Sequence, residues 1–491
     1  MYEYLALVPI IFPILGAMIT YALGKYSEKL QDIFLVAFTV FLFLINAALL
    51  AGMQSGSIKQ LVYGFVVLDS TGVFISALVA FIGALAVFYS FIYKDATHYD
   101  NTYFIMYLLL MGMMSGLAST YNVIIMLIFL EAATVISAVL ILFGRTKRAI
   151  KATYVYLAIS IVEVILVVAG AFILYNSTGT LDLSLLKPGM IGQGDMFLLA
   201  MLFLFGFGTK AGLLPLGIIW LPPAHAEAPP PVSATMSGIL VMASVIAMIK
   251  AVYPFYLVSD VSMLILVITS LGILNMLVGI VMALLSTDLK RLLAYSTVSS
   301  VGYITLGLGL ASPTAIYGAL FYIMSHLLYK GGLFLIAGAL ILRIHTRQMP
   351  KMGGLIRQMP LTGICFLVFA LSISGAVPLL NGFVSKELIY QGAANAGYNV
   401  YFTAFGIEFT IFAIIGWITS ILTFICFIRA FWLIFMGKPR GDFKSVKDPP
   451  LYMMLPILIM ACLCVVIGVY PDLLSGALQY TAQTLHGLTL L

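Results

Sequence analysis

Residues 206–215 read Gly-Phe-Gly-Thr-Lys-Ala-Gly-Leu-Leu-Pro, and this stretch decides which fold the chain can adopt. It lies within a long apolar run, so Lys210 falls about midway along a predicted membrane-spanning helix. The glycines and Pro215 interrupt that helix, which frees backbone carbonyls and lets water approach the lysine. Irregular backbone at membrane depth is tolerated only where it is buried in protein or lines a wet cavity. The stretch therefore predicts a broken helix around a polar site inside a membrane protein.

A second stretch has the same character. Gly375, Pro378, Asn381 and Gly382 interrupt another apolar run shortly before Lys386. Each interruption falls in the fourth helix of a predicted set of five. Interrupted segments at matching places in two halves are typical of transporters that are built from repeats and hold their ion sites near the midplane.

The composition agrees with a membrane protein. Of the 491 residues, 63% are hydrophobic and 9% are charged, compared with roughly 45–50% and 25% in an average soluble domain. A soluble globular protein is excluded, and little of the chain remains for an extramembrane domain. Because no nucleotide, flavin or metal motif is present, an enzyme active site within this chain is the weakest interpretation.

Apolar runs bounded by charged or Pro/Gly/Asn-rich breaks predict fourteen spanning helices in an all-α polytopic fold. We expect them at about residues 4–24, 32–52, 72–93, 103–119, 121–143, 153–175, 196–220, 234–257, 261–285, 291–311, 314–342, 361–395, 405–435 and 452–475. The predicted domains are helices 1–3 (1–102), a first repeat (103–257), a second repeat (261–435) and a C-terminal helix with its tail (452–491).

The basic residues of the loops test this count. Only Lys59 and Lys187 lie on the side that is reached after even-numbered helices. Seventeen lie on the other side: Lys25, Lys29, Lys94, Arg145, Lys147, Arg148, Lys151, Lys290, Arg291, Arg343, Arg347, Lys351, Arg357, Lys438, Arg440, Lys444 and Lys447. Such an asymmetry predicts that the richer side is cytoplasmic, so both termini of this cell-membrane protein should face outward.

Five basic residues remain within the predicted spans: Lys210, Lys250, Lys330, Lys386 and Arg429. A charge at the centre of a spanning helix costs about 2.5–3.5 kcal/mol on insertion scales, so it persists where it faces protein, water or a partner. Lys250 and Arg429 lie toward helix ends, where we expect them to snorkel to the interface.

Three further polar residues lie at mid-depth. Glu131 and Glu163 fall midway along the fifth and sixth predicted helices. His326 lies four residues before Lys330, so both side chains share one helical face. Static buried ion pairs are the alternative explanation, but so many mid-depth groups favour an ion pathway.

Metal and disulfide chemistry find little support in the sequence. The four cysteines lie in apolar runs with no histidine or carboxylate at ligand spacing, so we expect no metal or other cofactor there. His225 and Glu227 could ligate a metal, but a third ligand is missing nearby. We expect the segment Pro222–Ser233 to form a stiff cytoplasmic turn instead.

Five motifs resemble the antiporter-like proton-translocating subunits shared by respiratory complex I, multisubunit Mrp sodium/proton antiporters and membrane-bound energy-converting hydrogenases. The motifs are Phe129–Ala132, Gly208–Lys210 with the Pro222–Ser233 segment, Asp288–Ser296, His326–Gly331 and Gly382–Glu387. The resemblance covers about residues 70–440. It implies fourteen helices, two inverted five-helix repeats with broken seventh and twelfth helices, and a half-channel for protons in each repeat.

The same resemblance implies residue roles. Glu131 and Lys210 would form the coupling pair of the first half, and His326, Lys330 and Lys386 the relay of the second. Glu163 and Lys250 would be accessory residues.

The sequence departs from the family pattern at one place. Many relatives have a lysine where this chain has Met242. Lys250 lies eight residues later, about 12 Å along a helix, and cannot replace it. Water, Ser237 or Ser244 would have to bridge the two halves.

We therefore expect a subunit that translocates protons, or exchanges sodium for protons, within a multisubunit energy-converting complex. The sequence of residues 225–234, His-Ala-Glu-Ala-Pro-Pro-Pro-Val-Ser-Ala, favours a hydrogenase-type complex. An Mrp-type antiporter subunit is the alternative, followed by a quinone-reducing complex I subunit and an organic-solute transporter. Expected partners are other antiporter-like or small Mrp-type membrane subunits and the lipid bilayer, but not nucleic acid.

Overall fold

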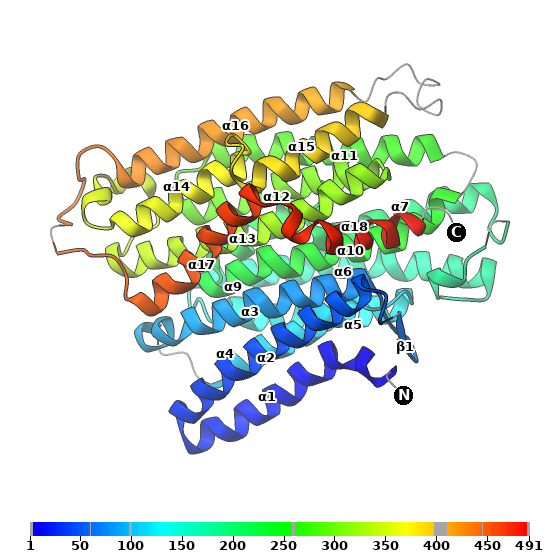
Figure 1. The fold of residues 1–491 in the computed structure, drawn as a ribbon, viewed down its shortest axis with the longest axis horizontal. Helices are drawn as coiled ribbons and strands as arrows, with labels where there is room; N and C mark the ends of the chain where they lie inside the picture. Colours follow the sequence, from blue (N-terminus) through cyan, green and yellow to red (C-terminus); the bar gives the residue numbers. More distant parts are fainter. Residues whose placement is uncertain are drawn as a thin grey trace.

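The computed structural model describes residues 3–58, 60–97, 101–187, 189–257, 261–396, 410–443 and 445–488. Long helices lie side by side and run roughly along one direction (Figure 1). Lipid offers the backbone no hydrogen-bond partner, so a chain this apolar satisfies its amides within helices. The only strands among the described residues, β1 (Leu61–Tyr63) and β2 (Val66–Leu68), form a short antiparallel hairpin before the third helix.

The N-terminal part and the first five-helix set contain these elements: η1 (Glu3–Leu7), α1 (Val8–Tyr26), α2 (Glu28–Gln54), α3 (Ser70–Thr97), α4 (Asn101–Ala118), α5 (Val123–Leu142), α6 (Lys147–Thr178), η2 (Leu183–Leu185), α7 (Gln193–Ala211), α8 (Gly217–Glu227), α9 (Pro230–Thr235), the π-helical segment η3 (Met236–Leu240), α10 (Val241–Val252) and η4 (Tyr253–Leu257).

The second set and the C-terminal part contain α11 (Val261–Leu285), α12 (Leu289–Gly309), α13 (Pro313–Ile344), η5 (Met349–Lys351), η6 (Leu355–Arg357), α14 (Pro360–Ser374), α15 (Asn381–Ala396), α16 (Thr410–Phe435), α17 (Leu451–Val469) and α18 (Asp472–Gly487).

The prediction of fourteen crossings is confirmed within the described part of the chain. Thirteen helices are long and apolar enough to cross a membrane, and α14 with α15 supplies the fourteenth crossing as a broken helix. The first residues of the predicted helix 405–435 lie outside the described residues. The boundaries assigned to the two repeats stay a prediction.

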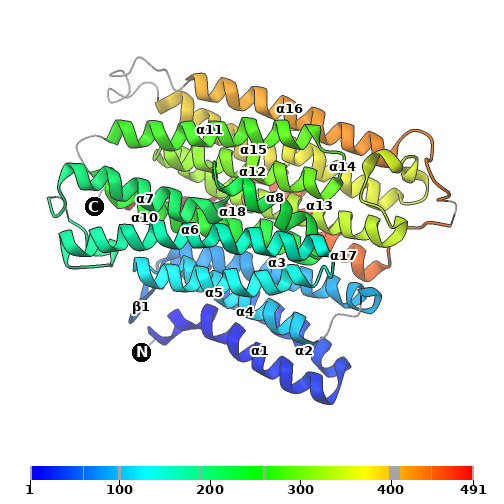
Figure 2. The ribbon, with the colours of Figure 1, turned by 180° about the vertical axis from the view of Figure 1, so that it is seen from behind.

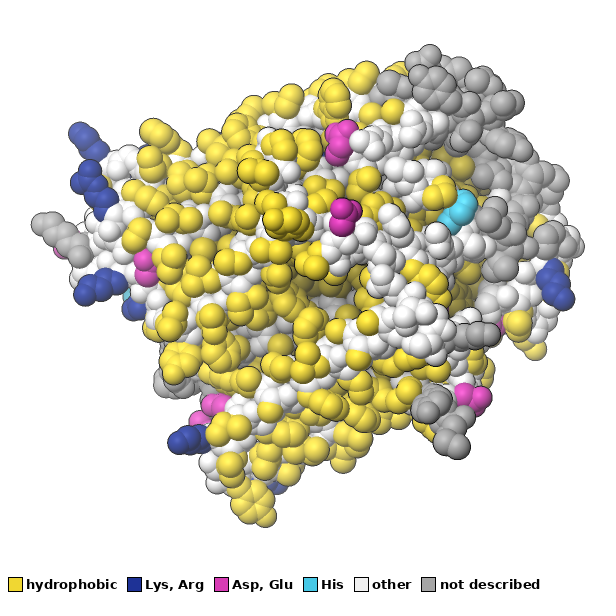
Figure 3. Space-filling view, in the orientation of Figure 1, with side chains coloured by type: hydrophobic (Ala, Val, Ile, Leu, Met, Phe, Trp, Pro, Cys, Tyr) yellow, Lys and Arg dark blue, Asp and Glu magenta, His cyan; other side chains and the backbone are white. Residues whose placement is uncertain are grey.

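The chain ends on the same side of the molecule as it begins, as an even number of crossings requires (Figure 1). Hydrophobic side chains cover the middle of the face in Figure 3, and lysine and arginine side chains lie at its two ends. This distribution is typical of a protein whose central band contacts hydrocarbon.

The C-terminal segment differs from the prediction. The apolar run 452–475 is not one helix, because α17 ends at Val469 and α18 begins at Asp472. Pro471 cannot donate an amide to a continuing helix, so the chain bends between them. α18 then packs against α2, α3 and α13.

Candidate functional site

The break in the seventh crossing lies directly after Lys210. α7 ends at Ala211 and is capped by Gly212, whose φ of +92° belongs to the left-handed region that favours glycine. The Asn275 side chain from α11 replaces the lost helical partners: its Nδ2 donates to the Gly212 carbonyl at 2.9 Å, and its Oδ1 accepts from the Leu214 amide at 2.9 Å. The predicted interruption is confirmed, and a side chain from the second set satisfies it.

The twelfth crossing breaks in a similar way. α14 ends at Ser374 and is capped by Gly375, with φ +67°, and α15 begins at Asn381. The Ser372 hydroxyl donates to Asn381 Oδ1 at 2.5 Å across the break. Lys386 follows the break, whereas Lys210 precedes its own, so the two lysines approach their interruptions from opposite sides.

Lys210 lies among polar and aromatic side chains within an apolar bundle. Its Nζ is 3.2 Å from Glu163 Oε2 and donates to Ser160 Oγ at 2.6 Å. The Tyr156 ring lies 4.4 Å from the same nitrogen. Lys210 and Glu163 are only 1% and 0% exposed, so both charged groups are buried in the protein interior.

Glu163, and not the expected Glu131, makes the direct ion pair with Lys210, while the coupling role of Glu131 stays a prediction. α6, which carries Glu163, packs directly against α7, whereas the main packing partners of α5 are α4 and α6. Glu131 is only partly buried, and its Oε1 has no hydrogen-bond partner among the described residues. Glu163, expected as an accessory residue, is therefore the ion-pair partner of Lys210, while Glu131 interacts with it at longer range.

Lys250 does not snorkel, contrary to the prediction. It is 0% exposed, and its Nζ lies 3.1 Å from Asp69 Oδ2 and donates to the Ala118 carbonyl at 2.8 Å. Tyr121 donates to Asp69 at 2.5 Å and places its ring 4.3 Å from the lysine nitrogen. The sequence reasoning missed Asp69, although a lone carboxylate directly before an apolar run is a signal that could have found it.

Lys330 has no carboxylate partner among the described residues. Its Nζ donates to the Leu293 carbonyl at 2.7 Å and to the Ser296 hydroxyl, both on α12. His326, one turn earlier, contacts Ser237 Oγ through Nε2 at 3.4 Å. Both side chains are fully buried.

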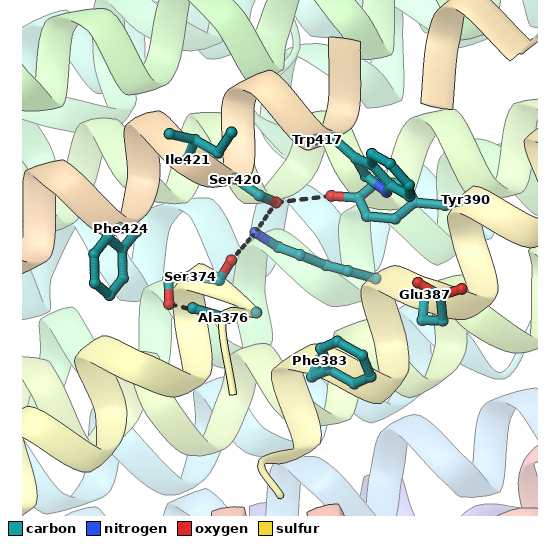
Figure 4. Close-up of a pocket in the computed structure, with 11 residues that line it drawn as sticks. Ser374, Ala376, Phe383, Glu387, Tyr390, Trp417, Ser420, Ile421 and Phe424 are labelled. Atoms are coloured by element: carbon teal, nitrogen blue, oxygen red, sulfur yellow. Dashed lines mark hydrogen bonds between the residues drawn. The ribbon is translucent and has the colours of Figure 1, made fainter. Parts of the chain in front are cut away.

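Lys386 also lacks a carboxylate within ion-pair distance in the described part of the chain. Its Nζ donates to the Ser374 carbonyl at 3.1 Å and to Ser420 Oγ at 2.8 Å, and Tyr390 shares Ser420 at 2.7 Å. These groups line a pocket of about 430 Å³ between α14, α15 and α16. Figure 4 shows Ser374, Ser420 and Tyr390 at this site, with Glu387 also at its wall.

The centre of the molecule lacks a lysine at Met242, which is 1% exposed. The Ser244 hydroxyl returns to the Leu240 carbonyl of its own helix at 2.7 Å, so it does not bridge the halves. Ser237 does reach across, since its Oγ lies 2.9 Å from Thr297 Oγ1 and also contacts His326. Ser237 lies in the π-helical segment η3, an irregularity that is often found at functional sites.

The expected turn over Pro222–Ser233 is shorter than predicted, because only Ala228 and Pro229 lie between α8 and α9. Pro222 and Pro223 lie inside α8, and Pro230 begins α9, where its missing amide costs nothing. His225 is 0% exposed, and its Nε2 has no hydrogen-bond partner among the described residues. The described residues contain no group of three metal-ligating side chains.

Lys290 was expected in a loop, but it is 3% exposed and donates to the Ala228 carbonyl between α8 and α9. Nearby, Arg347 lies 2.6 Å from Glu227 and 2.5 Å from Asp288. Burial opposes the charge of Arg347, but the two carboxylates together raise the pKa of its guanidinium above the usual value. The contacts of Lys290, Arg347, Glu227 and Asp288 thus connect the turn between α8 and α9 to the start of α12.

The sequence of this chain matches a known protein family. The sequence profile described as "NADH:quinone oxidoreductase/Mrp antiporter, TM" matches residues 120–412, which contain both broken helices. The chain belongs to this family. It is therefore a multi-pass membrane protein, as the thirteen candidate spans indicate.

Relatives come from several branches of the family. The chain is 31% identical to an NADH-quinone oxidoreductase subunit of Desulforudis audaxviator, over 82% of this chain and 81% of that one. It is 29% identical to an Na(+)/H(+) antiporter subunit of Bacillus subtilis, over 98% and 96%. It is 31% identical to hydrogenase-4 component B of Escherichia coli over 73% of this chain, but the match spans only 55% of that longer relative.

Solved structures agree on the fold. A chain of the Mrp complex from Dietzia superposes with a TM-score of 0.87 at 20% identity, covering 99% of this chain and 98% of that one. A chain of an archaeal membrane-bound sulfane sulfur reductase superposes with a TM-score of 0.86 at 23% identity, over 99% and 98%. At these identities the similarity establishes the fold alone.

Proposed function

We propose that this chain translocates protons, alone or in exchange for sodium, as one subunit of a multisubunit membrane complex. The observation that carries the proposal is that four of the buried lysines, Lys210, Lys250, Lys330 and Lys386, lie inside crossings, whereas a fifth, Lys290, lies at the start of α12. So many buried cations exceed what a stable bundle requires, because each carries a desolvation cost.

The contacts of these lysines suit two roles: one lysine is held charged by a carboxylate, and two can lose their protons. Lys210 faces Glu163, so it is held charged until a neighbouring charge weakens the pair. Lys330 and Lys386 contact hydroxyl and carbonyl oxygens, so either can lose its proton without leaving an uncompensated anion. Alternation between charged and neutral lysines is what a proton relay needs.

The relay that we propose begins at Lys210 with Glu163 and Glu131 and continues through His326, Lys330 and Lys386. Ser237 is the best-supported link between the halves, because it contacts both Thr297 and His326. Lys250 with Asp69 is an accessory pair. This assignment follows the repeats proposed at residues 103–257 and 261–435.

The relatives support two kinds of complex to which this chain could belong. A hydrogenase-type complex is supported by the likeness to hydrogenase-4 component B. An Mrp-type antiporter is the second candidate, because the chain covers 96% of the Bacillus subtilis antiporter protein. Other membrane subunits are the expected partners in either case, since the superposing chains come from multisubunit complexes.

One experiment tests the proposed function and distinguishes the two candidate complexes. The complex is purified through a tag on this chain, its subunits are identified, and it is reconstituted into vesicles with a pH-sensitive dye inside. We expect proton movement that Lys210→Met abolishes at equal complex content. Redox-driven pumping would indicate the hydrogenase-type complex, sodium-dependent proton exchange the Mrp type, and undiminished proton movement by Lys210→Met would refute the proposal.

A further inference from the structure

A polar pocket lies at the basic end of the bundle, apart from the lysines described above. It has a volume of about 570 Å³ and is formed where α11 ends and α12 begins, with the start of α6 opposite. Its polar wall consists of Arg148, Arg291, Arg347, Asp288, Ser286, Thr287, Tyr295 and Gln348. Its apolar wall consists of Met282 and Leu285.

The pocket carries unbalanced positive charge. Arg347 pairs with both Glu227 and Asp288, so these three residues carry a net charge of −1, and Arg148 with Arg291 brings the total to +1. Arg148 and Arg291 are exposed, and neither has an ion-pair partner within 4 Å among the described residues. Two free guanidinium groups on facing elements form a site for an anion with several oxygen acceptors, of which phosphate is the usual example.

An apolar stripe leads away from the pocket along α11. Leu274, Val278, Val281 and Leu285 are 50%, 36%, 45% and 70% exposed, and their spacing puts them on one helical face. Leu285 belongs to both the stripe and the pocket wall. Figure 2 shows α11 and α6 as long helices on this face, with the broken helix α7–α8 between them.

We propose that this pocket binds the headgroup phosphate of an anionic phospholipid, with Arg148 and Arg291 as donors and an acyl chain along the α11 stripe. A basic pocket between membrane helices near the cytoplasmic surface suits such a headgroup. A zwitterionic lipid is disfavoured because its own cation would approach the two arginines. Free phosphate would use the arginines but gain nothing from the stripe.

The bound lipid would cover the surface beside α8, between α6 and α11. That helix carries Trp220, which donates to the Thr209 carbonyl next to Lys210 at 2.8 Å. The acyl chain of the bound lipid would therefore pack against α8, the second half of the broken helix. The inference does not depend on ion translocation, because the site contains none of the four lysines buried inside crossings.

The test uses the complex purified from its own membrane, with Arg148→Gln/Arg291→Gln as the variant. Lys351→Gln/Arg357→Gln is the matched control, since it removes two exposed positive charges elsewhere on the same basic end. Delipidated samples are titrated with phosphatidylglycerol, phosphatidylcholine or inorganic phosphate, and binding is followed by native mass spectrometry and by the midpoint of thermal denaturation.

We expect phosphatidylglycerol to bind the wild type and the control alike and to raise their midpoints. Binding to the variant should be weaker on the order of 30-fold, because each arginine near the surface contributes about a factor of five. The proposal fails if the variant binds phosphatidylglycerol like the wild type, if phosphatidylcholine binds equally well, or if inorganic phosphate gives the same midpoint shift. It also fails if a neighbouring subunit in the purified complex protects both arginines from chemical modification before any lipid is added.

Discussion

At the residue scale, the four lysines buried inside crossings differ in what compensates their charge. Lys210 and Lys250 each face a carboxylate, whereas Lys330 and Lys386 contact only neutral oxygens. Removing one member of a buried ion pair is costly because the other charge is left uncompensated, at roughly 3–5 kcal/mol. Removing both members with side chains of similar size can be nearly neutral.

Glu163→Gln should therefore reduce the amount of assembled complex severalfold, and Glu163→Gln/Lys210→Met should restore it. We expect the double variant to assemble but not to move protons, because both titratable members of the buried pair are gone and Glu131 has no lysine to exchange a proton with. Assembly is measured by quantitative blotting of membranes and proton movement in vesicles. Normal proton movement by the double variant would make the pair a static structural contact.

Lys386→Glu should retain more proton movement than Lys386→Ala. A protonated carboxyl at this position can still donate to the Ser374 carbonyl or to Ser420, and it can release its proton, whereas alanine removes every titratable atom. Both variants are compared in vesicles at equal complex content. If alanine performs better than glutamate, Lys386 is a structural residue.

At the element scale, the broken seventh helix depends on a side chain from α11, which lies outside the proposed first repeat 103–257. Asn275 accepts from the Leu214 amide and donates to the Gly212 carbonyl, both of which lie between α7 and α8. An unsatisfied buried backbone group costs about 1–3 kcal/mol. The conformation of the break is thus stabilised by α11.

We expect Asn275→Leu to lower the midpoint of thermal denaturation in detergent by several degrees and to reduce proton movement, because two buried backbone groups lose their partners. Leu274→Ala is the control, since this neighbour on α11 is 50% exposed and makes no polar contact with the break. Equal midpoints for both variants would show that water replaces the amide at no cost.

At the scale of the whole molecule, the distribution of basic loop residues predicts its orientation. Lys187 and Lys438 lie on opposite sides of the predicted topology, and both are exposed. In a background without Cys462, the one exposed cysteine of the described residues, an impermeant thiol reagent should label Lys187→Cys in intact cells. Lys438→Cys should react only after the membrane is opened, and the reverse pattern would invert the topology.

The number of crossings, the positions of both broken helices and the placement of Lys210, Lys330 and Lys386 inside spanning helices follow from the sequence alone, whereas the burial of Lys250 and Lys290 does not. Each depends on local properties: the length of an apolar run, a glycine or proline within it, and a charge far from any loop. Glu163, Lys330 and Lys386 could be selected in this way because a charge within such a run is conspicuous whatever it contacts.

Only the tertiary structure decided which groups meet. Glu131 and Glu163 are equivalent mid-helix carboxylates in the sequence, and the packing of α6 against α7 selects Glu163 as the partner of Lys210. The pairing of Lys250 with Asp69, the burial of His225 and the bridge from Ser237 to His326 likewise depend on contacts between segments far apart in the chain. Periodicity within one helix specifies a face, but the helix that covers this face is set by the packing of the whole bundle.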